Sequence, residues 1–193
     1  MENESSNTQK SNQEKGDRAE KLFEQYLNDS NPRIPFYRID QTINTRSKEL
    51  QDKNISRPDY IIHTEKGIYY IDVKYRGKGV FNNEKRFIIG HDTITKMYQF
   101  QKELHQEVWL AFTNNLSVPE FYYTNMSILY EYYENFKKAY EEKFKDFDQL
   151  LIYIPNSAIL YDNLSFAKGF YKEPDIKYFE KEVEYIKGTA EKS

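Results

Sequence analysis

The stretch RPDYIIHTEKGIYYIDVKYR, residues 57–76, contains two short hydrophobic runs separated by HTEKG. Both runs are rich in β-branched and aromatic residues, and the separating segment ends in glycine, a pattern typical of a β-hairpin. Three charges stand where a buried strand should not carry them. Asp59 begins the first run, and Asp72 and Lys74 lie near the end of the second. The interpretation of the chain depends on whether these three side chains lie together.

The length of the turn decides which face of the hairpin each charge occupies. Directly opposed residues share a face, and side chains alternate between faces along a strand. A four-residue loop over 64–67 places Asp59 opposite Asp72. A two-residue loop over 66–67 places Asp59 opposite Lys74 instead. In both registers the three charges share one face, whereas a three-residue loop without a bulge would put Asp59 on the other face.

Two carboxylates and a lysine on one face are suited to phosphodiester hydrolysis. Carboxylates that lie close together raise one another's pKa unless a cation lies between them. Mg²⁺ takes oxygen ligands, commonly one or two carboxylates with waters and substrate phosphates, and needs neither Cys nor His. A lysine ammonium can orient the attacking water and offset the charge that develops on the phosphate.

These residues resemble the signature of the PD-(D/E)XK nuclease superfamily, which has the restriction-endonuclease-like fold. The Pro-Asp pair ends at Asp59, and the D-x-K pattern is Asp72, Val73 and Lys74 on the next strand. The resemblance implies that Asp59, Asp72 and the Val73 carbonyl bind a divalent metal and that Lys74 is catalytic. It implies a Mg²⁺-dependent DNA endonuclease that leaves 5′-phosphate and 3′-hydroxyl ends, with Mn²⁺ expected to substitute for Mg²⁺.

Two further residues resemble auxiliary members of such a site, and the resemblance covers roughly residues 16–115. Glu20, in the amphipathic segment GDRAEKLFEQYL, resembles the acid that the first helix often contributes, and it would reach the metal through water. Glu24 or Asp17 is the alternative for this role. Gln101, expected on the inner face of a later helix, resembles an auxiliary catalytic residue, although an inward-facing glutamine is often only a hydrogen-bonded core residue.

A basic segment, RGKGVFNNEKR, follows the hairpin and is expected to be a loop. Its cations are placed to contact nucleic-acid phosphates, and a plain solvated loop is the alternative. The residues concerned are Arg76, Lys78, Lys85 and Arg86. Because the net charge of the whole chain is −3, any binding of nucleic acid must be local.

The remaining pattern predicts an α/β protein with a central mixed β-sheet flanked by helices and an α-β-β-β-α-β core. The predicted elements are a helix within 16–28, a strand within 36–45, the hairpin, a helix over 92–104, a strand over 108–112, a helix over 126–147, a strand within 150–155 and a terminal helix near 178–187. Residues 1–15 are expected to form a disordered tail, residues 16–155 the nuclease-like domain, and residues 156–193 a C-terminal extension packed on it.

Composition narrows the function classes. The chain has no cysteine, which excludes disulfides and thiolate metal sites, and no apolar run long enough to span a membrane. We therefore expect a cytoplasmic protein without a membrane partner, acting on nucleic acid and most simply on DNA. Relatives of this kind often cut as homodimers, so a homodimer is a further expectation.

Two alternatives to a nuclease remain at this stage. The signature strings are short, and the D/E-x-K pattern recurs at 141–143 and 175–177, where no hairpin is expected. If the match at Asp59, Asp72 and Lys74 is also a chance match, Asp72 and Lys74 form an ordinary ion pair at a solvent-exposed end of the sheet. The protein would be a catalytically silent nucleic-acid-binding module, or an interaction module of a defence or mobile-element system that uses the tyrosine-rich helix over 126–147 as its surface.

Overall fold

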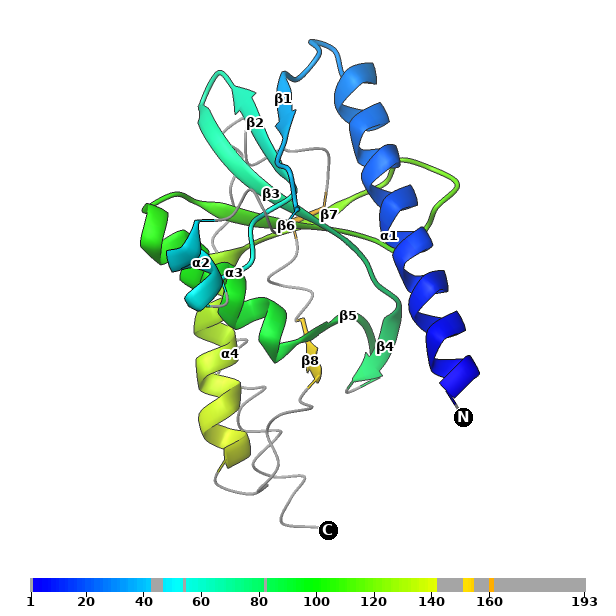
Figure 1. Ribbon diagram of the computed structural model, residues 1–193, viewed down its shortest axis with the longest axis vertical. Helices are drawn as coiled ribbons and strands as arrows, with labels where there is room; N and C mark the ends of the chain where they lie inside the picture. Colours follow the sequence, from blue (N-terminus) through cyan, green and yellow to red (C-terminus); the bar gives the residue numbers. More distant parts are fainter. Residues whose placement is uncertain are drawn as a thin grey trace.

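The protein is described from a computed structural model, which covers residues 2–42, 47–53, 55–81, 83–141, 151–154 and 160–161. The elements in chain order are α1 (Glu2–Asp29), β1 (Phe36–Arg38), α2 (Lys48–Asp52), β2 (Tyr60–Thr64), β3 (Gly67–Tyr75), β4 (Lys78–Phe81), β5 (Glu84–Gly90), α3 (His91–Leu104), β6 (Val108–Thr113), β7 (Tyr122–Asn125), α4 (Met126–Glu141), β8 (Leu151–Tyr153) and β9 (Leu160–Tyr161). Helix α1 covers one side of the main sheet, and α3 and α4 lie on the other side (Figure 1).

The main sheet is mixed. Within the described residues it has six strands in the order β1-β2-β3-β6-β7-β9, and β4-β5-β8 form a second, three-stranded sheet. Strands β3 and β6 pair in parallel, and the other pairs are antiparallel. A parallel pair needs a long crossover connection, which the β4–β5 hairpin and α3 provide here. The predicted fold class is confirmed, with α2 and β4–β5 added to the α-β-β-β-α-β core.

Strand β6 divides the apolar core into two layers. Trp109 and Ala111 pack with α1, whereas Val108, Leu110 and Phe112 pack with α3 and α4. All of β6 is buried, because helices cover both faces of the sheet at this strand. Strand β3, the neighbour of β6, is therefore held in the middle of the sheet.

Two expectations about local structure are wrong. Helix α1 begins at Glu2, so residues 2–15 are helical rather than a disordered tail. The packed half of the helix, which buries Ala19, Phe23 and Leu27, supplies the costly helical nucleus, and the Glu, Gln and Lys residues before it extend the helix at little cost. The segment RGKGVFNNEKR, expected to be a loop, instead contributes β4 and the start of β5 to a β-hairpin, and Asn83 in the turn has φ 62°, which Asn tolerates.

Only part of the C-terminal region is described. Helix α4 ends at Glu141 in the described chain, and the rest of the helix predicted to residue 147 lies outside the described residues, as does the predicted terminal helix. Leu160 and Tyr161 of β9 pair with β7, so this part of the C-terminal extension joins the main sheet. A search of the described helices for one long and apolar enough to cross a membrane found none.

Candidate active site

The β2–β3 hairpin has the register that places position 59 opposite Asp72. Its pairs run from Tyr60 and Ile71 to Thr64 and Gly67, and only two residues form the turn between the last pair. This is the register predicted for a four-residue loop over 64–67, with one additional pair closing it. The alternative loop over 66–67 is wrong.

Asp59 is fixed to β3 through its side chain. Proline at position 58 has no N–H to donate, so regular pairing stops there. The Asp59 N–H donates to the Ile71 carbonyl oxygen at 3.0 Å, and Asp59 Oδ2 accepts from the Val73 N–H at 2.7 Å. The carboxylate thus takes the place of a main-chain acceptor, and only 9% of Asp59 is exposed.

Asp72 and Lys74 form an ion pair on β3 in which Asp72 is buried and Lys74 is half-buried. They are two residues apart and so share a face. Lys74 Nζ lies 2.6 Å from Asp72 Oδ2, and Asp72 is 1% exposed. Burial alone would lower the pKa of Lys74, but the carboxylates of Asp72 and Asp59 outweigh it and raise this pKa. Lys74 is therefore a charged ammonium at neutral pH.

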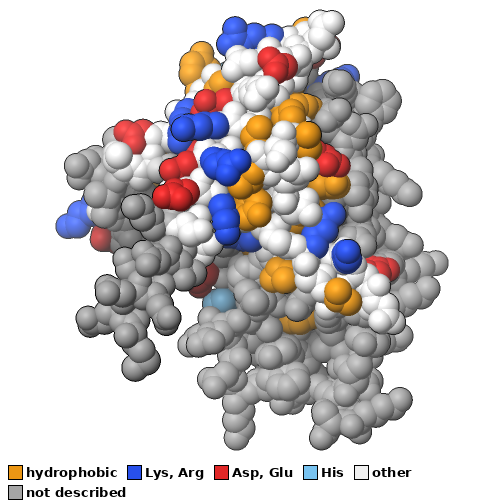
Figure 2. Space-filling view, turned by 90° about the vertical axis from the view of Figure 1, so that its right-hand side faces the viewer, with side chains coloured by type: hydrophobic (Ala, Val, Ile, Leu, Met, Phe, Trp, Pro, Cys, Tyr) orange, Lys and Arg blue, Asp and Glu red, His pale blue; other side chains and the backbone are white. Residues whose placement is uncertain are grey.

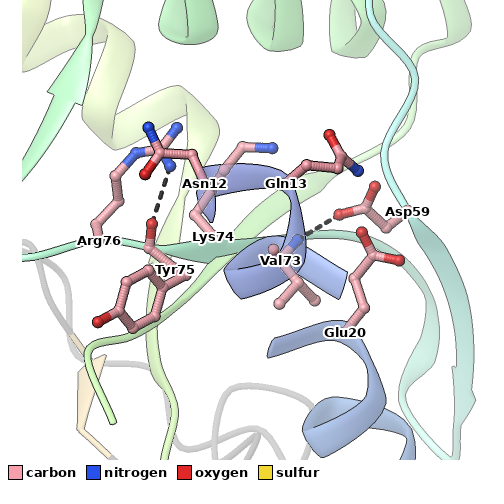
Figure 3. Close-up of a pocket in the computed structure, with 9 residues that line it drawn as sticks. Asn12, Gln13, Glu20, Asp59, Val73, Lys74, Tyr75 and Arg76 are labelled. Carbon is pink, nitrogen blue, oxygen red and sulfur yellow. Dashed lines mark hydrogen bonds between the residues drawn. The ribbon is translucent and has the colours of Figure 1, made fainter. Parts of the chain in front are cut away.

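A pocket of about 540 Å³ opens beside these residues (Figure 3). It is lined by Asp59, by residues 73–76 at the end of β3, and by Asn12, Gln13, Gly16 and Glu20 on α1. Asp72 is not in the lining, but it contacts Lys74, which is. The structure thus brings Glu20, Asp59 and Lys74 to one pocket, and Asp72 contacts Lys74.

Glu20 is held by residues that the sequence did not indicate. It forms an ion pair with Arg38 of β1, whose Nη1 also lies 3.4 Å from Glu24 Oε1. The Tyr60 hydroxyl donates to the same Glu24 oxygen at 2.9 Å, and Tyr60 is opposite Arg38 in the sheet. Burial raises the pKa of Glu20, although Arg38 opposes this shift. No spacing in the sequence links an arginine of the first strand to two acids of the preceding helix.

The contacts of Glu20, Glu24 and Asp17 show which of these three acids of the first helix is placed at the pocket. Glu24 is engaged by Tyr60 and Arg38, and Asp17 accepts from Gln13 Nε2 at 2.9 Å. Of the three, Glu20 lines the pocket.

The electrostatics of the site favour a bound cation. Burial, and then the negative charge of Asp72, raise the pKa of Asp59 to about 8. At neutral pH Asp59 therefore keeps its proton unless more positive charge is supplied. No group of three or more Asp, Glu, His or Cys side chains in the described chain has the arrangement of a complete metal centre. Asp72 Oδ2 is paired with Lys74 Nζ, and two carboxylates with a carbonyl and waters suffice for Mg²⁺. The residues fit such an ion.

Of the four basic residues expected to contact phosphates, Arg76 alone lines the pocket. The prediction that Arg86 contacts phosphates is wrong, because its side chain is fully buried and paired with Glu84 at 2.8 Å. Lys78 Nζ lies 4.7 Å and 4.5 Å from the ring centroids of Phe87 and Tyr122. Lys85 is exposed on β5. The face on the α1 side carries Lys and Arg next to acidic side chains rather than one basic field (Figure 2).

Gln101 is not brought to the pocket. Its Oε1 accepts from the Val108 N–H at 3.0 Å, and its Nε2 donates to Ser127 Oγ at 2.6 Å. Val108 pairs with Tyr70 near the start of β3, whereas the pocket lies at the end of that strand. Gln101 joins α3, β6 and α4, and the auxiliary catalytic role expected for it is not part of the proposed site.

Together, the mixed sheet and the carboxylate–lysine hairpin define a nuclease-like α/β protein. The model of the nuclease-related domain family matches residues 15–124, more than half of the chain, and the chain therefore belongs to that family. The predicted resemblance to PD-(D/E)XK nucleases is confirmed at the level of the family.

One solved structure similar to the chain is that of Hjc from Archaeoglobus fulgidus, a Holliday junction resolvase from an archaeal hyperthermophile. It is 13% identical with a TM-score of 0.46, and the match covers 82% of this chain and 99% of that one. A search of curated proteins found no match.

Proposed function

We propose that this nuclease-related protein is a Mg²⁺-dependent endonuclease that hydrolyses phosphodiester bonds in DNA, with Mn²⁺ able to replace Mg²⁺. The observation that carries the proposal is the position of Asp59. Its carboxylate is anchored to the Val73 N–H beside the ion pair of the buried Asp72 with Lys74, at the wall of an open pocket. Buried charges are costly, and a hairpin has no structural need for three of them together.

In this proposal Asp59, Asp72 and the Val73 carbonyl would hold the metal ion, and Glu20 would reach it through water. Bound there, Mg²⁺ would neutralise charge on the phosphate and lower the pKa of a water molecule. Arg38 keeps the Glu20 carboxylate at the pocket through their ion pair. Arg76, which lines the other end, offers a guanidinium to a phosphate oxygen.

Lys74 has the central role among the residues of the chain. Asp72 holds its ammonium at the pocket wall, where it orients the attacking water in line with the leaving 3′ oxygen. The water oxygen bonds to phosphorus as the bond to the 3′ oxygen breaks. One water proton ends on that oxygen and the other is released, which leaves a 3′-hydroxyl and a 5′-phosphate.

Cleavage of plasmid, single-stranded and branched DNA with Mg²⁺, Mn²⁺ or EDTA tests this proposal. Lys74→Ala and Asp72→Asn should each lower the cleavage rate by roughly 10²-fold or more. Lys66→Ala is the matched control, because Lys66 lies in the exposed turn at the other end of the same hairpin. No cleavage of any substrate by the wild type would contradict the enzyme assignment, and full activity of Lys74→Ala would contradict the site.

The two alternatives give different results in the same assay. A catalytically silent binding module would bind DNA in the presence of EDTA and would not cleave it with either Mg²⁺ or Mn²⁺. An interaction module built on the tyrosine-rich helix is disfavoured, because Tyr132, Tyr133 and Phe136 are buried in the core. The homodimer remains a prediction, which sedimentation of the protein with and without DNA would test.

A further inference from the structure

The pocket has three chemically different parts. Acidic side chains, Glu20 and Asp59, lie at one end, and Lys74 and Arg76 supply positive charge. The third part comes from residues 12–16 of α1, where the residues that line the pocket are two neutral carboxamides, Asn12 and Gln13, and Gly16. In the view of Figure 3, Asn12 lies on the Arg76 side of the pocket and Gln13 on the Asp59 side. The proposed hydrolysis uses the first two parts and leaves the third without a role.

Carboxamides suit the neutral portion of a nucleotide. A phosphodiester needs cations and a metal, whereas a sugar or a base edge presents uncharged donors and acceptors that Asn and Gln can match. Gln13 is restrained for such a contact because its Nε2 donates to Asp17 one turn further along the helix. The pocket volume of about 540 Å³ is within the range of small-ligand sites.

Gly16 leaves open space on the α1 side of the pocket, between the side chains of Gln13 and Glu20 along the chain. A Cβ placed on it would meet no atom within 4 Å, so the helix leaves open space at that point. Glycine within a helix costs stability relative to alanine. A residue without a side chain therefore lines the pocket at some cost to the stability of the helix, which is consistent with space being needed there.

Asn12 and Gln13 also precede the region matched by the family model, which begins at residue 15. The shared nuclease-related part of the chain thus supplies the acids and cations of the pocket, and a segment beyond that part supplies the carboxamides.

From these observations we infer that Asn12, Gln13 and Gly16 form a substrate-binding wall that contacts the sugar or base of the nucleotide next to the scissile phosphate. The inference rests on the proposed function and adds specificity-determining residues to it. The residues of this wall bind substrate and take no part in the chemical step, so their loss should weaken binding without slowing turnover at saturation.

Equilibrium binding to the full-length protein in EDTA tests this wall without cleavage, with a short fluorescein-labelled single-stranded oligodeoxynucleotide as the probe. Gln13→Ala and Asn12→Ala should each weaken binding about 3- to 10-fold, the loss expected for one hydrogen bond. In the cleavage assay KM should rise by the same factor while kcat changes less than about 2-fold. Gln25→Ala, on an exposed position of the same helix, is the control and should change neither value.

Two further comparisons separate this wall from a general effect on α1. Gly16→Ala should raise the melting temperature and retain binding, whereas Gly16→Leu should fill the space and weaken binding by more than about 10-fold. Arg18→Leu, at an exposed position, controls for the added leucine. In competition, a deoxynucleoside monophosphate should displace the probe from the wild type better than inorganic phosphate does. That advantage should shrink in Gln13→Ala.

Each outcome decides between the inference and the proposed function. If the wild type cleaves DNA and the Asn12, Gln13 and Gly16→Leu variants behave like their controls, the wall is refuted and the nuclease stands. If the wild type binds with this pattern of losses but cuts nothing, the wall stands and the nuclease fails. An absence of both binding and cleavage refutes both.

Discussion

Asp59 combines properties that come from different neighbours. Pro58 ends the pairing of β2, and the Val73 N–H then fixes the Asp59 carboxylate. The charge on that carboxylate depends on residues further along the chain, because burial and Asp72 together raise its pKa to about 8. A group that titrates so far from its ordinary value links stability to pH and to metal binding.

The metal-free protein should lose stability as the pH rises. The pKa of Asp59 is 3.8 ordinarily and about 8 in the folded state, so the folded state binds more protons between these values. Stability is then greatest below about pH 4 for this group and declines towards about pH 8. Asp59→Asn should remove this decline and raise the melting temperature in EDTA at about pH 8 by about 2 °C or more.

Thermal unfolding of both proteins from about pH 5 to about pH 8 measures this effect. Identical slopes for the wild type and Asp59→Asn would contradict the raised pKa. With Mg²⁺ the dependence should reverse, since Asp59 must lose its proton to bind the ion and Mg²⁺ affinity should rise over the same range. Isothermal titration in two buffers of different ionisation enthalpy would detect the released proton.

Arg38 should matter for activity more than for stability. It is 55% exposed in its side chain, and exposed ion pairs contribute about 0 to 1 kcal/mol. Its ion pair with Glu20 nevertheless fixes a carboxylate at the pocket. Arg38→Ala should lower kcat roughly 10-fold with little change in melting temperature, and Arg38→Lys should restore part of it.

The cleavage rates of Arg38→Ala, Glu20→Gln and the double variant form a cycle that checks this prediction. If Arg38 acts by positioning Glu20, its loss has no further effect once Glu20→Gln is present. Additive losses would show that Arg38 acts by another route.

At the scale of elements, β3 determines where the chemistry lies. Its central part is paired on one side with β2 and on the other with β6. The end of the strand runs past the start of β2 at Tyr60, so residues 73–76 can line the pocket. Helix α1 completes the pocket because its packed half is held on Ile71 and Val73 of the same strand.

Gln101 holds the start of β6, which is the end of the strand away from the pocket. The buried Val108 has its N–H paired with the Gln101 carboxamide, which also joins Ser127 of α4. Gln101→Ala should lower the free energy of unfolding by about 1 to 3 kcal/mol, because the Val108 N–H would lose its partner. Chemical denaturation and cleavage kinetics measured together test this assignment. A large loss of kcat in protein that is still folded would return Gln101 to a catalytic role.

At the scale of the whole molecule, the second sheet is attached to the main sheet through aromatic rings. Phe87 of β5 packs on Phe112 and Tyr122 with ring centroids 5.2 Å and 5.3 Å away. Lys78 of β4 lies over Phe87 and Tyr122 and so contacts both sheets. Its ammonium contributes here to packing, because cations are attracted to aromatic ring faces.

Lys78→Ala should therefore lower stability by about 0.5 to 2 kcal/mol without changing the salt dependence of DNA binding. If Lys78 contacts a phosphate instead, the slope of log affinity against log salt should decrease in magnitude by about 1. Binding measured at several salt concentrations separates the two roles. Arg76→Ala is the comparison, since Arg76 lines the pocket and its loss should change the slope.

The sequence alone determined the hairpin and the side chains it brings together. The structure decided between the two registers that an even-length turn allows, and position 59 lies opposite Asp72. Alternation along a strand requires Asp72 and Lys74 to share a face, and either register places Asp59 on that face as well. These are local constraints, so they can be read from the order of residues. The resemblance to PD-(D/E)XK nucleases rested on the same short pattern, whereas membership of the nuclease-related domain family was shown by a match over residues 15–124.

Only the tertiary structure decided which residues outside the hairpin reach the site. Glu20, Glu24 and Asp17 all lie on the first helix, and the packing of α1 on β3 together with the position of Arg38 selects Glu20. Arg86 was expected at the surface but is buried, because the segment after the hairpin folds into its own sheet. These outcomes depend on contacts between elements distant in the chain, and residue order does not specify such contacts.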